Sequence, residues 1–358
     1  MKVESLKLKD VYQIYLDQVH AALKGEPVVW PEEQTDSLLR LHVMQGTAAL
    51  VFARVLEQES LSSYARAQMK GVCLSTMQQH VPLQHTLQVA WTALEKAGIK
   101  AVLMKGAGLA ALYPEPHQRA WGDVDLFVGK NQYHQAAAVM RETFPNALKF
   151  DEELDHYKHY NLIADGVSIE IHRVTVGLQH PIDERRYARF EQEGMLMSDE
   201  RLVINDLEVR VPEPTFNALL VFLHSWEHAM TQGATMRQIC DLAFLLQHYG
   251  ERIDYKRLHT YLRALHLEEP WELYMSIIDN QPTDNPFISD MLSGRLCEPK
   301  SEKIEAKNRV LRKIHTMRQR LNNARRIQQY SPSYARHMVA TTLLHGAGRL
   351  FAKDRHWE

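Results

Sequence analysis

Cysteine is scarce in this chain of 358 residues, where Cys73, Cys240 and Cys297 are the only three and lie far apart. An odd number of widely spaced cysteines gives neither a disulfide framework nor a zinc site built on cysteine pairs. Because disulfides persist mainly in oxidising compartments, a reducing compartment is the simplest setting for such a chain. We therefore expect a cytoplasmic protein.

Long apolar runs and an excess of one charge are missing as well. No apolar stretch is long enough to cross a bilayer, and the chain does not open on an apolar signal core. The formal net charge is −2, so no global positive field indicates nucleic acid as an obligatory partner. With 45% hydrophobic and 24% charged residues, the composition is that of a globular protein that buries a core.

The apolar pattern divides the chain into three predicted parts. Helical spacing of apolar residues dominates 1–98 and returns over 213–358, while 99–212 alternates short apolar strands with helices. We expect a small mixed sheet with helices on it, and therefore an α+β core between two helical regions.

The first part is predicted to be helical throughout. Apolar residues recur at roughly helical spacing over 35–56, and a later helix is expected over 83–97. Pro82 stands just before the later helix, in the first-turn position that proline favours. No short motif in this part suggests chemistry, so we expect it to pack against the core or to frame a substrate.

The core has four predicted strands that form a sheet, and a further hairpin is expected over 202–211 around Asn205-Asp206. Asp165-Gly166 separates the last two strands, and this dipeptide is typical of a two-residue turn between antiparallel strands. The strands are expected over 101–104, 123–128, 158–163 and 167–174, and the helices over 107–113 and 132–143.

Two carboxylates, Asp123 and Asp125, open one of these strands. Side chains two positions apart on a strand lie on the same face of the sheet. Two adjacent like charges are unfavourable unless a cation or shared protons neutralise them. Mg²⁺ is a natural partner, because it prefers oxygen ligands and usually arrives with substrate phosphates. The pair therefore suggests phosphoryl or nucleotidyl chemistry.

A third acid, Glu170, lies on a later strand and shares its face with Ser168 and His172. Paired divalent ions in an in-line displacement need bridging and flanking carboxylates. We therefore expect Glu170 beside the two aspartates, and His172 in contact with substrate or with a carboxylate. Taken alone, Glu170 would more often be an exposed strand residue.

A turn with two glycines, Lys105-Gly106-Ala107-Gly108, precedes the aspartates. Glycine lets backbone N–H groups approach an anion closely, and the N-terminus of the following helix favours negative charge. Lys105 and Arg119 are the candidate cations on the phosphate side. An alternative stays open, in which the glycines only permit the turn and Lys105 or Arg119 pairs with Asp123 or Asp125.

Five short motifs follow one another along the middle of the chain: Lys105-Gly106-x-x-Leu109, Tyr113-Pro114, Arg119-x-x-Gly122-Asp123-Val124-Asp125-Leu126, Ile169-Glu170-Ile171-His172 and, more weakly, Arg237-x-x-x-Asp241-Leu242. Together they resemble the uncharacterised bacterial nucleotidyltransferase family of the polymerase-beta superfamily. The resemblance covers roughly 100–245 and says little about either end. Many members of the superfamily have Gly or Ser where this chain has Ala107. Alanine lacks the serine hydroxyl that could contact phosphate, but the backbone N–H donors of the turn remain.

The resemblance implies a polymerase-beta-like core in which Asp123 and Asp125 are metal ligands and Glu170 is the third acid. It also implies transfer of a nucleoside monophosphate from an NTP to an acceptor hydroxyl or phosphate, with release of pyrophosphate. ATP is the expected nucleotide, and Mg²⁺ or Mn²⁺ the expected cofactor. The alternative is a nucleotide-binding or interaction module that keeps this fold without turnover.

Two other patterns point elsewhere. His224-x-x-Glu227-His228 matches H-x-x-E-H, the inverted zinc-protease pattern, which needs a third ligand from another element. Nineteen histidines in the chain make a chance match easy, so we favour a helix that simply packs.

The C-terminal segment is locally basic. From residue 301 onward, there are thirteen Lys or Arg and four Asp or Glu. We favour a solvated helix face there over a phosphate-rich or anionic partner.

Overall fold

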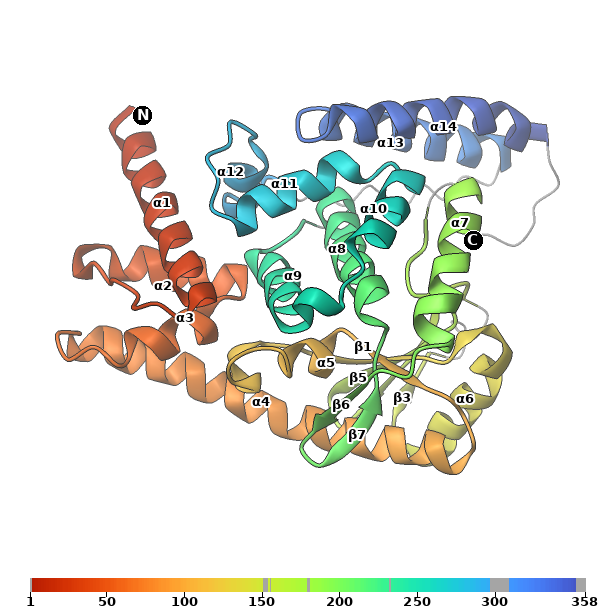
Figure 1. The fold of residues 1–358 in the computed structure, drawn as a ribbon, viewed down its shortest axis with the longest axis horizontal. Coiled ribbons are helices and arrows are strands. Elements are labelled where there is room, and N and C mark those ends of the chain that lie inside the picture. Colours follow the sequence, from red (N-terminus) through yellow and green to blue (C-terminus); the bar gives the residue numbers. More distant parts are fainter. Residues whose placement is uncertain are drawn as a thin grey trace.

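A five-stranded sheet stands at the centre of the structure, which is a computed structural model and describes residues 2–150, 154, 156–178, 181–231, 233–296 and 309–351 (Figure 1). Helices surround the sheet, so the predicted α+β class, with helical regions flanking a small mixed sheet, is confirmed. The strand order is β1-β2-β5-β4-β3. The strands are β1 (Val102–Met104), β2 (Asp123–Phe127), β3 (Leu148–Lys149), β4 (His159–Ala164) and β5 (Val167–His172).

The sheet is mixed because β2 and β5 run parallel while the other neighbouring strands are antiparallel. The hairpin predicted at Asp165-Gly166 joins β4 to β5. Both turn residues have positive φ, 50° for Asp165 and 82° for Gly166, as a tight two-residue turn of this kind requires. The turn fixes the register of β4 against β5, and with it the residues that face each other across the two strands.

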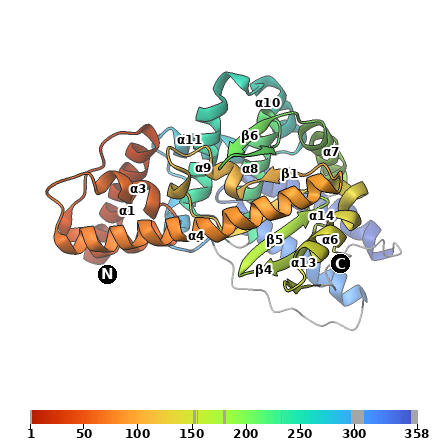
Figure 2. The same ribbon diagram turned by 90° about the horizontal axis from the view of Figure 1, so that it is seen from below.

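One face of the sheet is apolar and covered by two helices. Val124, Ile169 and Ile171 are fully buried there. They belong to one apolar cluster with residues of α4 (Ser63–Lys96) and α6 (Gly129–Thr143). Figure 2 shows α4 crossing this side of the sheet. The strict alternation of side chains along a strand then sends the intervening residues to the opposite face.

The opposite face of β2 and β5 is polar. The helix α8 (Pro214–Thr231) lies on this side, away from α4 (Figure 1). Polar groups enclosed between a sheet and a helix are stable only if they are paired or hold a ligand, which makes this face the place to look for function. Its polar side chains are those of Asp123, Asp125, Ser168, Glu170 and His172, and Phe127 shares this face.

The helix α4 is longer than the sequence suggests. It runs without a break through Pro82, so the prediction that a helix begins at Pro82 is wrong. Pro82 lies on the exposed side of the helix, where water can satisfy the carbonyl that loses its donor. The first half of α4 packs in the cluster of the N-terminal helices through Ala65 and Met69, and the second half packs under the sheet. Burial in two cores therefore outweighs the cost of the proline.

The segment 35–56, predicted to be helical, forms two helices. Gly46 ends α2 (Thr35–Gln45) in the left-handed conformation, with φ of 69°, and α3 (Ala48–Val55) follows. A glycine adopts that conformation without steric cost and commonly ends a helix. The first helix of the chain is α1 (Lys2–Lys24).

Apolar residues of α1, α3, α8 and α9 share one buried cluster. The three predicted parts, with boundaries near 98 and 212, therefore pack against one another in this cluster. Their division into separate domains stays a prediction.

Short 3₁₀ or π-helical turns lie at Glu32–Gln34, Pro116–Gln118, Gln192–Leu196 and Gly250–Arg252. The remaining elements are α5 (Gly106–Ala110), α7 (Pro181–Glu191), β6 (Arg201–Ile204), β7 (Leu207–Arg210), α9 (Met236–Tyr249), α10 (Tyr255–Ala264), α11 (Glu268–Ile278), α12 (Phe287–Leu292), α13 (Arg309–Ile327) and α14 (Pro332–Phe351).

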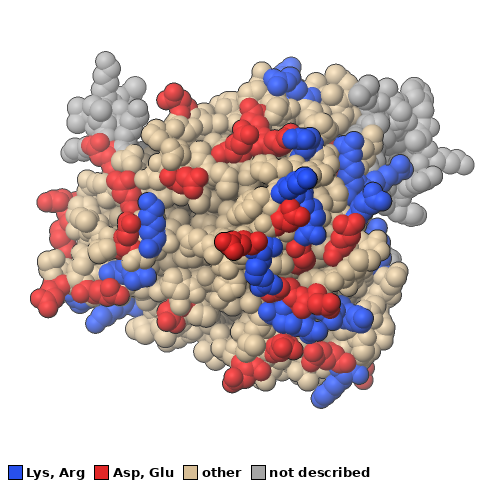
Figure 3. Space-filling model, in the orientation of Figure 1, with Lys and Arg blue, Asp and Glu red and all other residues tan. Residues whose placement is uncertain are grey.

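The basic segment predicted from 301 onward lies partly outside the described residues, at 301–308 and 352–358. In α13, Arg326 donates hydrogen bonds to the carbonyl oxygens of Leu296 and Met230, so this arginine anchors the helix. Figure 3 shows positive and negative side chains interspersed over the face drawn. Within the described residues, no helix is both long and apolar enough to cross a membrane.

Candidate functional site

The register of β2 against β5 brings the predicted acids together. Asp125 lies directly beside Glu170, and Asp123 beside Ser168. Residues paired across neighbouring strands point to the same face, so Asp123, Asp125 and Glu170 share one side of the sheet, as the sequence predicted. Asp125 is 1% exposed, whereas Asp123 and Glu170 are partly exposed.

The electrostatics of the two aspartates show an excess of negative charge. The Asp125 carboxylate and burial raise the pKa of Asp123 to about 6, and Lys105 offsets only part of that effect. Three carboxylates face one ammonium group here, because Arg119 is paired elsewhere. This donor set of carboxylate oxygens fits a hard divalent cation, which would remove the repulsion that raises the pKa.

Lys105 forms the ion pair that the sequence left as an alternative. Its Nζ lies 3.1 Å from Oδ1 of Asp125, and its backbone has a positive φ of 48° just before α5. Burial lowers the pKa of Lys105, but the charges of Asp125, Asp123 and Glu170 outweigh burial and raise it. Burial likewise raises the pKa of Asp125, but Lys105 and the His172 hydrogen bond outweigh burial and hold it well below its ordinary value.

Within the turn, Gly106 is required by its surroundings and Gly108 is not. Gly106 has φ of 29°, and a Cβ there would lie 3.0 Å from the Asp123 carbonyl oxygen. A Cβ on Gly108 would meet nothing closer than 3.8 Å. Ala107 is 2% exposed and packs in the cluster under the sheet. The turn therefore ties α5 closely to β2, while its predicted contact with phosphate stays a prediction.

Arg119 differs from the expectation, which placed it on phosphate or on one of the paired aspartates. Its Nε and Nη2 donate to the two carboxylate oxygens of Asp241 at 2.6 and 2.7 Å, and its Nη1 donates to the Gly106 carbonyl at 3.1 Å. Both side chains are almost fully buried, at 4% and 3% exposure. The hydroxyl of Tyr113 also donates to Asp241. With its donors engaged in this way, Arg119 holds the turn in place.

The cation beside the open part of the site is Arg237. A cavity of about 530 Å³ is lined by Asp123, Glu170 and Ser168 from the sheet, by 120–122 and by Arg237 from α9. The Nη1 of Arg237 donates to the Ala120 carbonyl at 3.1 Å. The motif Arg237-x-x-x-Asp241 was the signal for this residue: Asp241 binds Arg119, and Arg237, one helical turn earlier, reaches the cavity.

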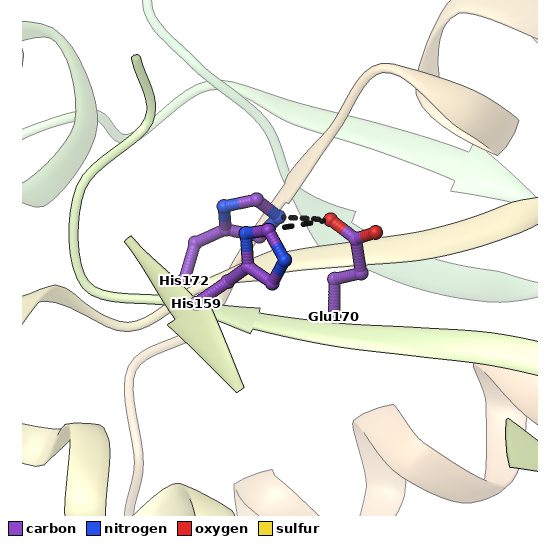
Figure 4. Close-up of side chains that lie close together, drawn as sticks. All are labelled: His159, Glu170 and His172. Atoms are coloured by element: carbon purple, nitrogen blue, oxygen red, sulfur yellow. Dashed lines mark ion pairs between the residues drawn. The ribbon is translucent and has the colours of Figure 1, made fainter. Parts of the chain in front are cut away.

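His172 and His159 complete the polar face (Figure 4). The Nε2 of His172 lies 2.9 Å from Oδ1 of Asp125 and 3.0 Å from Oε2 of Glu170, so the predicted contact with a carboxylate is present. The Nδ1 of His159 lies 3.9 Å from the same Glu170 oxygen. Burial lowers the pKa of His159 to about 4. No motif in the sequence singled out His159.

The H-x-x-E-H helix faces the same site. Burial and the nearby Lys105 ammonium hold the pKa of His224 well below its ordinary value, and burial lowers the pKa of His228 to about 4. Burial raises the pKa of Glu227. In the part of the chain that the structure describes, the one group of three metal-ligating side chains with mutually close ligand atoms is His159, Glu170 and His172. The zinc-protease interpretation therefore has no third ligand among these residues.

The family described as "Uncharacterised nucleotidyltransferase" has a sequence model that matches residues 31–280, more than half of the chain. The chain belongs to this family, and the resemblance seen in its motifs is confirmed.

Comparison with individual proteins adds a distant neighbour. No curated protein matches the chain. Among solved structures, it is similar to an antigenic nucleotidyltransferase-like protein from Paracoccidioides brasiliensis, with 18% identity over 56% of this chain and 94% of that chain, and a TM-score of 0.33.

Proposed function

We propose that the protein transfers a nucleoside monophosphate from an NTP to an acceptor hydroxyl or phosphate and releases pyrophosphate, in a metal-dependent reaction. The observation that supports this most is the juxtaposition of Asp123, Asp125 and Glu170 on one face of the sheet beside a cavity. Family membership supports a general nucleotidyltransferase role. ATP is the first nucleotide to test, and the acceptor is to be found by screening.

Asp123 and Asp125, with Glu170, would hold Mg²⁺ or Mn²⁺. Their fit is electrostatic: three carboxylates outnumber the two nearby basic side chains, Lys105 and Arg237, and the net negative charge favours a divalent ion. The bound ion supplies charge neutralisation for the triphosphate and polarises the phosphoryl oxygen.

Two basic side chains would position the triphosphate. Arg237 lines the cavity next to Asp123, where its guanidinium can bind phosphate oxygens in a forked arrangement. Lys105 stays charged because three carboxylates raise its pKa, so it contributes a fixed positive charge beside them. Because little covalent chemistry falls to the protein in such transfers, positioning and electrostatic stabilisation supply most of the rate enhancement.

Glu170 is the candidate acceptor-side residue. Burial raises the pKa of Glu170, but the His172 hydrogen bond and the charges of His172 and His159 together outweigh burial and leave the pKa below its ordinary value. The carboxylate is therefore ionised at neutral pH and can accept the proton of an attacking hydroxyl or ligate a metal. His172, which touches both Glu170 and Asp125, holds the two carboxylates in their relative positions.

Calorimetric titration with a non-hydrolysable NTP and Mg²⁺, followed by a pyrophosphate-release assay over an acceptor panel, tests the proposal. Wild-type protein should bind the nucleotide only with Mg²⁺ and release pyrophosphate with a suitable acceptor. Glu170→Gln should retain much of the binding and lose release, whereas Glu208→Gln, an exposed glutamate on β7, should behave as wild type. Binding without release from any acceptor would favour the inactive nucleotide-binding module, and no binding would contradict both.

A further inference from the structure

We propose that His159, Glu170 and His172 bind a divalent first-row transition ion of the Mn²⁺ to Zn²⁺ series in preference to Mg²⁺. This proposal rests on the proposed function in one respect, which is the acceptor-side role of Glu170. The binding of the ion itself can be measured without turnover. The site would sit beside the oxygen-only pair formed by Asp123 and Asp125, so that the two positions differ in ligand chemistry.

The hairpin register creates the site. Counting back from the turn at Asp165-Gly166, His159 of β4 lies directly opposite His172 of β5. Glu170 is two residues before His172 on the same strand, and therefore on the same face. All three side chains stand on rigid paired strands, the kind of element that holds metal ligands at reproducible positions.

The separations between the ligand atoms suit a bound ion. Metal–ligand bonds of roughly 2.1 Å give neighbouring ligand atoms about 3.0–3.4 Å apart at octahedral or tetrahedral angles. Oε2 of Glu170 lies 3.0 Å from Nε2 of His172 and 3.9 Å from Nδ1 of His159, and the three ligand atoms all lie within 4.8 Å of one another (Figure 4). Small rotations of the imidazole rings would close the wider gap.

The imidazole of His159 is available as a ligand. Its Nδ1 is buried and has no hydrogen-bond partner among the described residues, a state that is unfavourable for a buried nitrogen. An imidazole nitrogen without a hydrogen-bond partner can offer its lone pair to a metal ion. The Nε2 of His172 lies within hydrogen-bond distance of two carboxylate oxygens, which only accept hydrogen bonds, so without an ion it carries a proton that a bound ion would displace.

The mixture of donors decides the class of ion. Mg²⁺ prefers six oxygen ligands and gives up its water reluctantly. Imidazole nitrogen instead suits the first-row transition ions, with affinity that rises from Mn²⁺ through Ni²⁺, and it also suits Zn²⁺. Two histidines and one carboxylate are the donor set of a transition-ion site that leaves positions open for water or substrate. Oδ1 of Asp125, 2.9 Å from Nε2 of His172, can add a further oxygen.

Metal-stripped full-length protein titrated with Co²⁺ and with Zn²⁺ tests the site. Co²⁺ binding should give visible absorption bands of nitrogen-ligated Co²⁺, and calorimetry should show a Zn²⁺ site that excess Mg²⁺ does not displace. His159→Gln should weaken both ions more than about tenfold. His156→Gln is the matched control, because His156 is the neighbouring histidine, outside the ligand set, and should bind both ions as wild type does.

Two further variants separate this site from its neighbours. Asp123→Asn should keep the Co²⁺ spectrum while losing Mg²⁺-dependent NTP binding, so a failed nucleotide assay does not decide the transition-ion site. His228→Gln should keep the spectrum as well, because His228 belongs to the H-x-x-E-H helix. Co²⁺ binding that is unchanged in His159→Gln, or absent from the wild type, would overturn the proposal. All variants should first be matched to the wild type in circular dichroism.

Discussion

Replacing Asp123 with asparagine should make the metal-free protein more stable while removing its metal site. The Asp125 carboxylate and burial raise the pKa of Asp123 from an ordinary value of 3.8 to about 6. Near neutral pH the side chain is nevertheless ionised, so its repulsion is present in the folded state. Asparagine keeps the shape of the side chain and removes the charge.

The size of the effect follows from the pKa. The rise from 3.8 to about 6 corresponds to roughly 3 kcal/mol at about 1.4 kcal/mol per pKa unit. Because Asp123 is partly exposed, solvent screening reduces this to about 2 kcal/mol in the free energy of unfolding. A change of that size in the stabilising direction is unusual for a point substitution.

The dependence on pH has a definite sign. Because the pKa of Asp123 is higher in the folded than in the unfolded state, protonation of Asp123 stabilises the folded state. This contribution to the free energy of unfolding is complete below pH 3.8 and is lost as pH rises through about 6. Asparagine has no such dependence. The difference in free energy of unfolding between Asp123→Asn and the wild type should therefore be small near pH 4. It should increase between the two pKa values and reach its full size near pH 7.

Urea unfolding in the presence of a chelator, at the acidic and neutral ends of this range, measures the difference. Adding Mg²⁺ and a non-hydrolysable NTP should then stabilise the wild type but not Asp123→Asn. Asp199→Asn, at an exposed position away from the site, is the control and should match the wild type throughout. The reasoning is refuted if metal-free Asp123→Asn is less stable than the wild type at neutral pH, or if Mg²⁺ with NTP stabilises both equally.

Three other predictions follow from the buried contacts. Lys105→Met should lower the free energy of unfolding by about 3 kcal/mol, because it leaves Asp125 buried without its ammonium partner; urea unfolding should show no loss if the pair is unimportant. Arg119→Gln and Asp241→Asn should each lower the free energy of unfolding by about 3–5 kcal/mol. A double-mutant cycle should show strong coupling between the two side chains, and additive losses would contradict their pairing. Gly106→Ala should displace β2 and weaken NTP binding in calorimetry, whereas Gly108→Ala should be tolerated; equal effects would show that the turn is not held as described.

The sheet and its acids could be predicted from the sequence because they depend on local patterns. The alternation of Glu170 with apolar neighbours fixed its face, and Asp165-Gly166 fixed a hairpin. The same turn also determines that His159 faces His172, since each step back on one strand pairs with a step forward on the other. That register was available in the sequence, so the histidine beside Glu170 could have been found.

Other features depend on contacts between distant parts of the chain. Arg119 and Asp241 are separated by 122 residues, and no local pattern distinguishes a buried arginine that binds an aspartate from one that binds phosphate. The continuity of α4 through Pro82 depends on packing in two cores, which outweighs the local preference of proline for a first turn. The position of α8 over the acids likewise follows from tertiary packing, which placed the H-x-x-E-H residues beside Lys105.

The fate of a phosphorus label in the NTP distinguishes transfer of a nucleoside monophosphate from transfer of the terminal phosphate. Purified protein with Mg²⁺ and a panel of acceptors would be given NTP labelled at the α-phosphorus or, in parallel, at the γ-phosphorus. The α-label should enter the acceptor and the γ-label should leave as pyrophosphate, and neither should occur with Asp123→Asn or Asp125→Asn. Transfer of the γ-label to the acceptor, or α-label transfer that persists in both aspartate variants, would contradict it.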